Sequence, residues 1–261
     1  MPERSYEFIK LETQGRILIV TINRPESFNS LHPPANIEMG HAFDDFAADD
    51  DQWVAIVTGA GEKAFSAGND LKWTAQNQGK LEIPPRGFGG LTSRFDLFKP
   101  VIAAVNGVAL GGGFEIALAC DIIVASSNAK MGLPEPRVGL AALATGMHRL
   151  PRQIGLKNAM GMMLTGRHID AAEGYRLGLV QEVMEPGKAL ERALAWANEI
   201  LECAPLSVRA TKQVASQSLG RPLEEAVKAH YPAVTELFKS EDFVEGPRAF
   251  AEKRKPSWKG R

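Results

Sequence analysis

The sequence predicts an α/β protein, and three observations support that prediction. Of its 261 residues, 44% are hydrophobic and 23% are charged, a composition typical of a globular chain with a sizeable core. Short β-branched runs punctuated by glycine recur through the first half, at residues 16–22, 53–58, 101–105 and 121–125. Segments with helical spacing lie between them, and strands that alternate with helices indicate α/β architecture.

Each strand and helix predicted in the first half has its own signal in the sequence. The N-terminus runs directly into an alternating strand pattern, which residues 16–22 (RILIVTI) continue as a buried strand. A helix follows, because Ile37, Met39, Phe43 and Phe46 recur at helical spacing before the next strand at 53–58. Between the strands at 101–105 and 121–125, three consecutive glycines open a short apolar helix over residues 114–120.

The second half, after about residue 150, is predicted to be helical. One amphipathic helix follows the Pro186-Gly187 break and carries apolar residues from Leu190 to Leu201. Another begins at Pro222, and Pro232 should kink or split it because proline cannot donate a backbone hydrogen bond. Residues 79–90 (GKLEIPPRGFGG) predict an irregular, mobile segment between the halves.

Charge and cysteine content exclude several function classes. Thirty basic and 31 acidic residues give a formal net charge of −1, which argues against nucleic acid or a membrane surface as a partner. Cys120 and Cys203 form no CxxC pair, so neither a disulfide scaffold nor a cysteine zinc site is expected, and no other metal site is predicted. Without a signal-peptide pattern or an apolar run of about 20 residues, the expected location is cytoplasmic.

Three local patterns imitate known functional motifs. Residues 59–64 (GAGEKA) follow a strand as a dinucleotide fingerprint does, but a turn into another strand is the favoured interpretation. Residues 64–68 (AFSAG) are close to the nucleophile elbow of serine hydrolases, with Ser66 as nucleophile, yet alanine stands where the sharp turn needs glycine. The aspartates within residues 44–51 do not have the spacing of a calcium loop and are interpreted as a solvated helix end.

Three other features are harder to explain as structure alone. Residues 67–72 (AGNDLK) form a loop of small residues that lets backbone approach a ligand closely. Residues 111–115 (GGGFE) place free N–H groups and a positive dipole end at a helix start, with Glu115 one turn in. Glu135 follows Pro134 in a stiffened turn. A helix N-terminus suits a developing oxyanion, and two carboxylates suit acid–base chemistry.

Together these motifs resemble the crotonase superfamily of enoyl-CoA hydratases and isomerases. The segments that resemble its successive signatures are KAFSAGNDLK, KPVIAAVNGVALGGGFEIALACDIIVAS, PEPRVGL followed by RLPRQIG, and GPRAFAEKRKPSWKGR. The resemblance runs from about residue 8 to the end of the chain. Within the superfamily the chain is most similar to bacterial members near crotonobetainyl-CoA hydratase.

The resemblance implies a fold and an assembly. The fold would be the ClpP/crotonase-like spiral of ββα units, with residues 1–195 as the core that holds the CoA site and active site. Residues 196–261 would form a helical C-terminal trimerisation region. The resemblance therefore implies a homotrimer or a dimer of trimers, and a lyase of fatty acid metabolism and β-oxidation.

The resemblance also implies a mechanism. Backbone N–H groups of Asn69 and Gly112 would hold the thioester oxygen, while Glu115 takes a proton from water and Glu135 delivers one to C2. The presence of two glutamates favours reversible hydration of a 2-enoyl-CoA over isomerisation, because the isomerases of the family often keep only the second glutamate. The alternatives are crotonobetainyl-CoA hydration with its reverse, enoyl-CoA isomerisation, and a non-catalytic acyl-CoA-binding or RNA-binding protein.

Coenzyme A would be part of the substrate, so no separate cofactor is expected. The residues that the resemblance assigns to CoA binding are Ser27, Phe28, Ala67, Gly68, Asp70, Leu71, Lys72, Phe250 and Lys253. Three departures affect these assignments. Glu26 stands where many members have a CoA-binding lysine, and Asn69 replaces the commoner small residue at the oxyanion position. Residues 141–150 (AALATGMHRL) replace a glycine-rich segment that borders the acyl pocket in the family, which puts a preference for plain fatty acyl chains in doubt.

Overall fold

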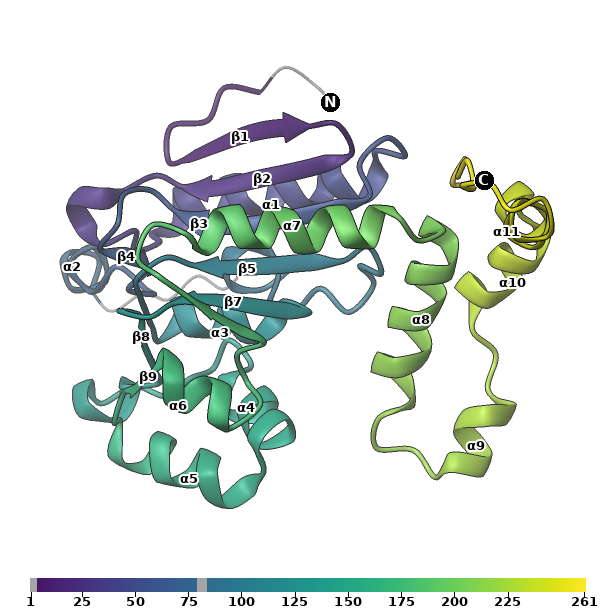
Figure 1. The fold of residues 1–261 in the computed structure, drawn as a ribbon. Helices are drawn as coiled ribbons and strands as arrows, with labels where there is room; N and C mark the ends of the chain where they lie inside the picture. The colour runs from purple at the N-terminus through teal and green to yellow at the C-terminus, as the bar shows by residue number, and fades with distance from the viewer. Residues whose placement is uncertain (1–3, 79–83) are drawn as a thin grey trace.

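The computed structural model describes residues 4–78 and 84–261, and its strands form two sheets (Figure 1). The larger sheet has six strands in the order β1-β2-β3-β5-β7-β10. These are β1 (Ile9–Gln14), β2 (Ile17–Ile22), β3 (Val54–Gly59), β5 (Val101–Val105), β7 (Ile122–Ser126) and β10 (Glu182–Met184). β1 and β2 are an antiparallel pair, and the other neighbours pair in parallel.

The smaller sheet has the order β4-β6-β8-β9 and consists of short strands. These are β4 (Ala64–Ser66), β6 (Val108–Leu110), β8 (Lys130–Gly132) and β9 (Ile169–Asp170). After each of β3, β5 and β7 the chain passes from the larger sheet into the next strand of the smaller sheet. A helix or helical turn then follows, so the ββα unit repeats and the predicted fold class is confirmed.

Helices cover both faces of the larger sheet. The α-helices that precede α8 are α1 (Pro33–Ala48), α2 (Leu71–Gln76), α3 (Gly112–Ala119), α4 (Gly146–Ile154), α5 (Leu156–Thr165), α6 (Ala171–Arg176) and α7 (Ala189–Leu201). Short 3-10 turns lie at η1 (Pro25–Ser27), η2 (Phe88–Gly90) and η3 (Glu135–Val138). In Figure 1, α7 runs across the larger sheet, with α1 on the opposite side.

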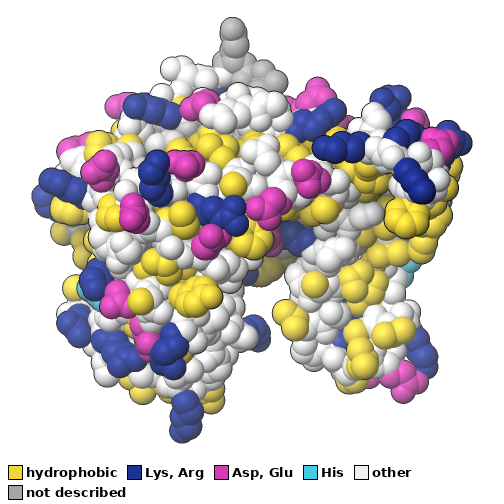
Figure 2. Space-filling model, in the orientation of Figure 1, with side chains coloured by type: hydrophobic (Ala, Val, Ile, Leu, Met, Phe, Trp, Pro, Cys, Tyr) yellow, Lys and Arg dark blue, Asp and Glu magenta, His cyan; other side chains and the backbone are white. Residues whose placement is uncertain are grey.

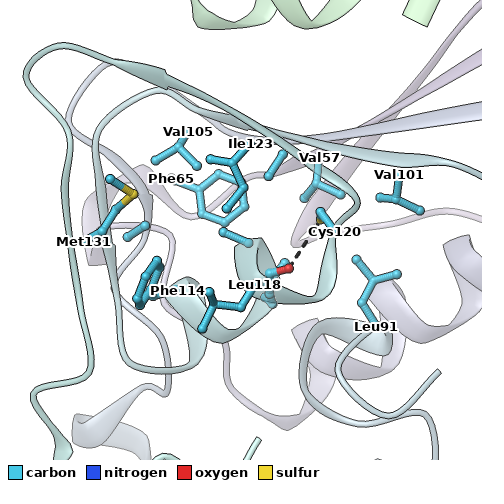
Figure 3. Close-up of a cluster of buried hydrophobic side chains, with 14 of the residues drawn as sticks. Val57, Phe65, Leu91, Val101, Val105, Phe114, Leu118, Cys120, Ile123 and Met131 are labelled. Atoms are coloured by element: carbon cyan, nitrogen blue, oxygen red, sulfur yellow. Dashed lines mark hydrogen bonds between the residues drawn. The ribbon is translucent and has the colours of Figure 1, made fainter. Parts of the chain in front are cut away.

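The core has two layers because side chains alternate along each strand. In β2, Leu18 and Val20 enter the layer that α1 and α3 cover, whereas Ile17 and Ile19 pack under α7. Figure 3 shows Phe114 of α3 among the buried side chains of the first layer. α3 is apolar nearly all round because the sheets enclose it, so a charged residue on this helix must have a specific environment.

The C-terminal helices extend away from the sheets as an arm (Figure 1). They are α8 (Pro205–Ser218), α9 (Leu223–Lys228), α10 (Pro232–Lys239) and α11 (Glu241–Ala251). The prediction at Pro232 is confirmed, since α9 ends before it and α10 begins with it. The expected division between residues 195 and 196 falls inside α7, and Ala193 and Ala197 on its two sides share one core layer.

Two further expectations concern the segment at residues 79–90 and the absence of membrane-spanning segments. Of the segment at 79–90, residues 79–83 lie outside the described residues, and its end forms η2. Within the described part of the chain, no helix combines the length and the apolar character needed to cross a bilayer.

Candidate active site

The N-terminus of α3 is the centre of the candidate site. Gly112 is the first residue of the helix, so its N–H has no acceptor within the helix. Gly111 precedes it with φ +53°, a conformation that favours glycine. A Cβ on Gly113 would lie 2.1 Å from the carbonyl oxygen of Ser66, so only glycine lets the helix start pack against the end of β4. The glycines therefore bring a free N–H against the loop that follows β4.

That loop contributes a second free N–H, from Asn69. The neighbouring groups are occupied, since Gly68 N–H donates to Ser66 Oγ at 3.1 Å and Asp70 N–H donates to the Leu31 carbonyl at 3.0 Å. The Asn69 N–H has no acceptor among the described residues. Gly68 has φ +85°, and a Cβ there would lie 2.7 Å from the nitrogen of Gly112. The two predicted oxyanion donors are thus brought together.

An ion pair between Arg24 and Asp70 anchors the loop that contains Asn69. Arg24 Nη2 lies 3.0 Å from Asp70 Oδ2, and Arg24 Nη1 also donates to the backbone carbonyl of Ser30. The Asp70 carboxylate caps α2 by accepting the N–H of Trp73 at 3.1 Å. The hydrogen bonds from Trp73 and Arg24 lower the pKa of Asp70, although its partial burial acts in the opposite direction. This side chain therefore has a structural role, whatever its backbone contributes to CoA binding.

Glu115 lies one turn into α3 and is only 3% exposed. Its Oε1 accepts the N–H of Gly146, the first residue of α4, at 2.7 Å. Burial, together with the charge of Glu135, raises the pKa of Glu115 to about 7, although hydrogen bonds from the backbone at 144 and 146 oppose the rise. At neutral pH this carboxyl is divided between its two protonation states, which suits a group that takes and returns a proton.

Glu135 lies at the start of η3 and faces the same helix end. A Cβ on Gly111 would come within 3.1 Å of Glu135 Oε1, so this carboxylate lies beside the free N–H groups of α3. Burial raises the pKa of Glu135. Its Oε2 is buried without a hydrogen-bond partner among the described residues. An unpaired buried oxygen favours the protonated acid, which can donate a proton.

Sequence reasoning missed three residues at this site. Gly146 donates to Glu115, and a Cβ there would lie 2.8 Å from Glu115 Oε1, so a larger residue would displace that carboxylate. Phe88 lies against Gly112, where a Cβ would approach its ring to 2.5 Å. Thr145 precedes Gly146 and has φ +80°. The isolated glycine within residues 141–150 was the available signal, but hydrophobic periodicity does not show what a glycine faces.

The residues assigned to CoA binding fall into two groups. The first group lies around the loop at residues 67–70. Ala67 N–H donates to the Phe28 carbonyl at 2.9 Å and places the Ser27–Phe28 turn beside this loop. Leu71 and Lys72 follow at the exposed start of α2. Phe250, 88% exposed, and Lys253 belong to the end of the C-terminal arm, away from α2 (Figure 1). Within a single chain the structure does not bring this second group to the site.

The imitated motifs have structural explanations. Residues 60–63 form a turn that leads from β3 into β4, with no helix to receive a pyrophosphate, which confirms the favoured interpretation. The Ser66 hydroxyl is fully buried and donates to the Asn29 carbonyl at 2.8 Å, so it is not placed as a nucleophile. Asp44 and Asp45 pair with Arg94 and Arg4, respectively, at 2.8 Å.

Comparison with known proteins agrees with this fold and site. The profile of the enoyl-CoA hydratase/isomerase family matches residues 12–261. The chain belongs to this family.

Individual relatives match over nearly the whole chain. Carnitinyl-CoA dehydratases from Salmonella typhi and from Escherichia coli K12 are each 43% identical over 263 residues, covering 98% of this chain and 99% of theirs. The crystal structure of an enoyl-CoA hydratase from Mycobacterium marinum superposes with a TM-score of 0.91 at 41% identity, covering 97% of this chain and 99% of that one. One from Mycobacterium tuberculosis H37Rv gives 0.91 at 40% identity, with the same coverage.

Proposed function

We propose that this chain is a hydro-lyase that adds water reversibly across the C2–C3 double bond of a 2-enoyl-CoA thioester. One observation carries the proposal: Glu115, with a pKa of about 7, and Glu135 lie at a helix end beside two free N–H groups. Two adjacent carboxyls can take one proton and supply another, as hydration requires. An isomerase moves a single proton between two carbons and needs only one such group.

The geometry supports a role for each group. The N–H groups of Asn69 and Gly112 hold the thioester oxygen, and each such donor stabilises the enolate-like transition state by about 3 kcal/mol. Ionised Glu115 takes a proton from the water that attacks C3. The electron pair of the double bond moves toward the thioester, and protonated Glu135 gives a proton to C2. The product is the 3-hydroxyacyl-CoA, and the same groups act in reverse for dehydration.

The CoA portion is assigned to the surface beside this oxyanion loop. Ser27, Phe28 and the backbone of residues 67–72 line the approach within one chain. Lys72 is exposed and offers its charge to a phosphate. Phe250 and Lys253 are assigned to the CoA site of a neighbouring subunit, since they lie at the end of the arm. This assignment requires an oligomer, and we propose the trimer or dimer of trimers that the resemblance implies.

Hydration can be followed by the loss of ultraviolet absorbance from the conjugated enoyl-thioester. With crotonyl-CoA we expect a rapid loss that depends on the wild-type protein and yields 3-hydroxybutyryl-CoA by mass spectrometry. Glu115→Gln, which keeps the size of the side chain and its acceptor oxygen, is the matched control. Unchanged absorbance with both crotonyl-CoA and crotonobetainyl-CoA would contradict the proposal.

A second candidate, hydration of crotonobetainyl-CoA and its reverse, is favoured by the 43% identity to carnitinyl-CoA dehydratases. A trimethylammonium group would need a carboxylate or an aromatic face near the acyl tail. Glu82 precedes η2 in the sequence and Asp96 follows it; Asp96 is paired with Arg86 at 2.7 Å, and Glu82 lies outside the described residues. The ratio of kcat/KM for the two substrates decides between the candidates. Turnover of the cationic substrate alone would establish the second, whereas a dominant rate with crotonyl-CoA would fit a short-chain hydratase of β-oxidation.

A further inference from the structure

The conformation of Thr145 calls for an explanation at the site. This residue precedes α4 with φ +80° and ψ 0°, in the left-handed region. A β-branched side chain is rarely found there, because its Cβ substituents crowd the backbone. Residues held in such conformations persist when surrounding contacts impose them, and they concentrate at functional sites.

The Thr145 hydroxyl supplies such contacts. It accepts a hydrogen bond from Arg149 Nε at 3.0 Å and donates to the backbone carbonyl of Thr92 at 3.3 Å. Arg149 Nη2 donates to the same carbonyl at 3.2 Å. Hydroxyl and guanidinium together fix the turn before α4 to the segment that follows η2.

Both ends of this network reach the proposed chemistry. On one side, the residue after Thr145 is Gly146, whose N–H donates to Glu115 Oε1 at 2.7 Å. On the other side, Thr92 N–H donates to the carbonyl of Phe88, and the Phe88 ring packs against Gly112. The left-handed turn aims the Gly146 N–H at the carboxylate, and the hydroxyl holds that turn.

We propose that Thr145 is a positioning residue for Glu115, whose hydroxyl keeps the Gly146 N–H directed at Glu115 Oε1. This inference rests on the proposed hydratase function. Thr145 touches neither substrate nor the reacting atoms in this scheme. It acts through the carboxylate that Gly146 binds.

The charged groups around Glu115 define the expected pH effect. Glu135 of η3 acts on its ionisation and raises its pKa, while the backbone N–H groups at 144 and 146 lower it. Arg149 of α4 is engaged with Thr145 and Thr92. Weakening the Gly146 hydrogen bond removes support for the ionised form, so the pKa of Glu115 must rise.

The test compares three substitutions at Thr145. Thr145→Val keeps the shape and removes the hydroxyl, Thr145→Ser keeps the hydroxyl, and Thr145→Gly removes both the hydroxyl and the strain. In the valine and glycine variants we expect kcat at pH 7 to fall at least about twofold with KM nearly unchanged, because less of Glu115 is ionised. The acid limb of the kcat profile should move up by about half a pH unit or more. The serine variant should stay close to wild type.

Two controls separate positioning from a merely structural role. Thr58→Val is matched, because the buried Thr58 hydroxyl also donates to a backbone carbonyl, at 2.9 Å, on β3. It should leave the pH profile unchanged. Thr145→Gly relieves backbone strain and should fold, so a displaced acid limb in a protein of wild-type thermal stability would be a positioning effect. Valine and glycine variants with the wild-type kcat and pH profile would overturn the proposal.

A second readout does not depend on turnover. The carboxyl infrared band of Glu115, isolated by subtracting the spectrum of Glu115→Gln, reports its titration directly. We expect its midpoint to be higher in Thr145→Val than in wild type and unchanged in Thr145→Ser. If the wild type hydrates no enoyl-CoA, the proposed function fails while this titration still decides the role of Thr145. An identical midpoint in wild type and Thr145→Val would overturn it.

Discussion

At the scale of single residues, Glu115 shows how reactivity is obtained at the expense of stability. It is a carboxyl on an apolar helix, 3% exposed, with Glu135 as a neighbour of like charge and backbone N–H groups as its hydrogen-bond partners. An ion pair would have stabilised the charge but would also have lowered the pKa far below neutrality. Backbone hydrogen bonds leave the pKa near the pH at which the proposed base must work.

This cost should be measurable as a pH-dependent stability. Burial raises the pKa of Glu115 from 4.5 to about 7, so the folded protein holds this proton more tightly than the unfolded chain does. The resulting stabilisation is fully present below about pH 4.5 and is lost as the pH rises through about 7. We expect Glu115→Gln to exceed wild type by up to about 3 kcal/mol at pH 8 and by little at pH 5. Urea unfolding at equal protein concentration checks this.

The comparison is informative because glutamine keeps the acceptor oxygen for the Gly146 N–H. A difference between the two proteins that is the same at pH 5 and pH 8 would contradict the assigned ionisation of Glu115. As a control, Glu225→Gln on α9 removes an exposed carboxylate whose surroundings give it no comparable burial. Its effect on stability should be small at both pH values.

At the scale of elements, the oxyanion loop is held by a cap and an ion pair that share one carboxylate. Asp70 accepts the first-turn N–H of α2 and pairs with Arg24, which also binds the Ser30 carbonyl. Because Asn69 adjoins this anchor, small movements of the loop change the direction of its N–H. Stability and the proposed chemistry are therefore linked at Asp70.

Two substitutions at Asp70 should separate the contribution of the helix cap from that of the ion pair. Asp70→Ala removes both cap and ion pair and should lower the free energy of unfolding by about 2 kcal/mol, with a lower kcat on enoyl-CoA. Asp70→Asn keeps a capping oxygen and should cost about half as much. Urea unfolding and initial rates provide the measurements. An alanine variant with wild-type stability would show that the anchor contributes nothing.

Much of the fold was predictable because long strands carry strong local signals. The runs at 16–22, 53–58 and 101–105 are buried on both faces, as their continuous β-branched character indicates. The short strands β6, β8, β9 and β10 were not predicted, since two or three residues give no periodicity. These strands form because the fold pairs them with strands that are distant in the sequence.

The site was predictable to a similar degree. The glycines and glutamates stood out as motifs, and the resemblance supplied their order. The contacts of Gly146, Phe88 and Thr145 depend on three segments that meet only in the folded chain. The terminal WKGR shows the same limit, because its role depends on Asp242, whose buried carboxylate accepts the N–H groups of Lys259 and Gly260.

At the scale of the whole molecule, the C-terminal arm exposes more apolar surface than an isolated chain needs. Hydrophobic side chains gather on the arm in Figure 2, beside the notch that separates it from the body. Leu219, Leu223 and Val227 are 79%, 80% and 74% exposed, respectively. Exposed apolar patches of this kind mark protein–protein interfaces, which supports the proposed oligomer.

Sedimentation velocity tests that proposal. We expect wild type to sediment with a mass of three or six chains. Leu223→Asp combined with Val227→Asp, which places charges one helical turn apart, should shift it toward smaller species. Glu225→Lys, on another face of α9, is the control and should keep the wild-type mass. A monomeric wild type would remove the basis for assigning Phe250 and Lys253 to a neighbouring CoA site.

The central claim is that two glutamates, the buried Glu115 and the half-buried Glu135, divide the proton transfers of hydration while backbone groups bind the thioester. Its most direct test measures turnover and thioester binding together in Glu115→Gln and Glu135→Gln. We predict that each variant loses at least about a thousandfold in kcat. Calorimetry should show that each still binds a saturated acyl-CoA within a few-fold of the wild-type Kd. Normal hydration by either variant would contradict the account.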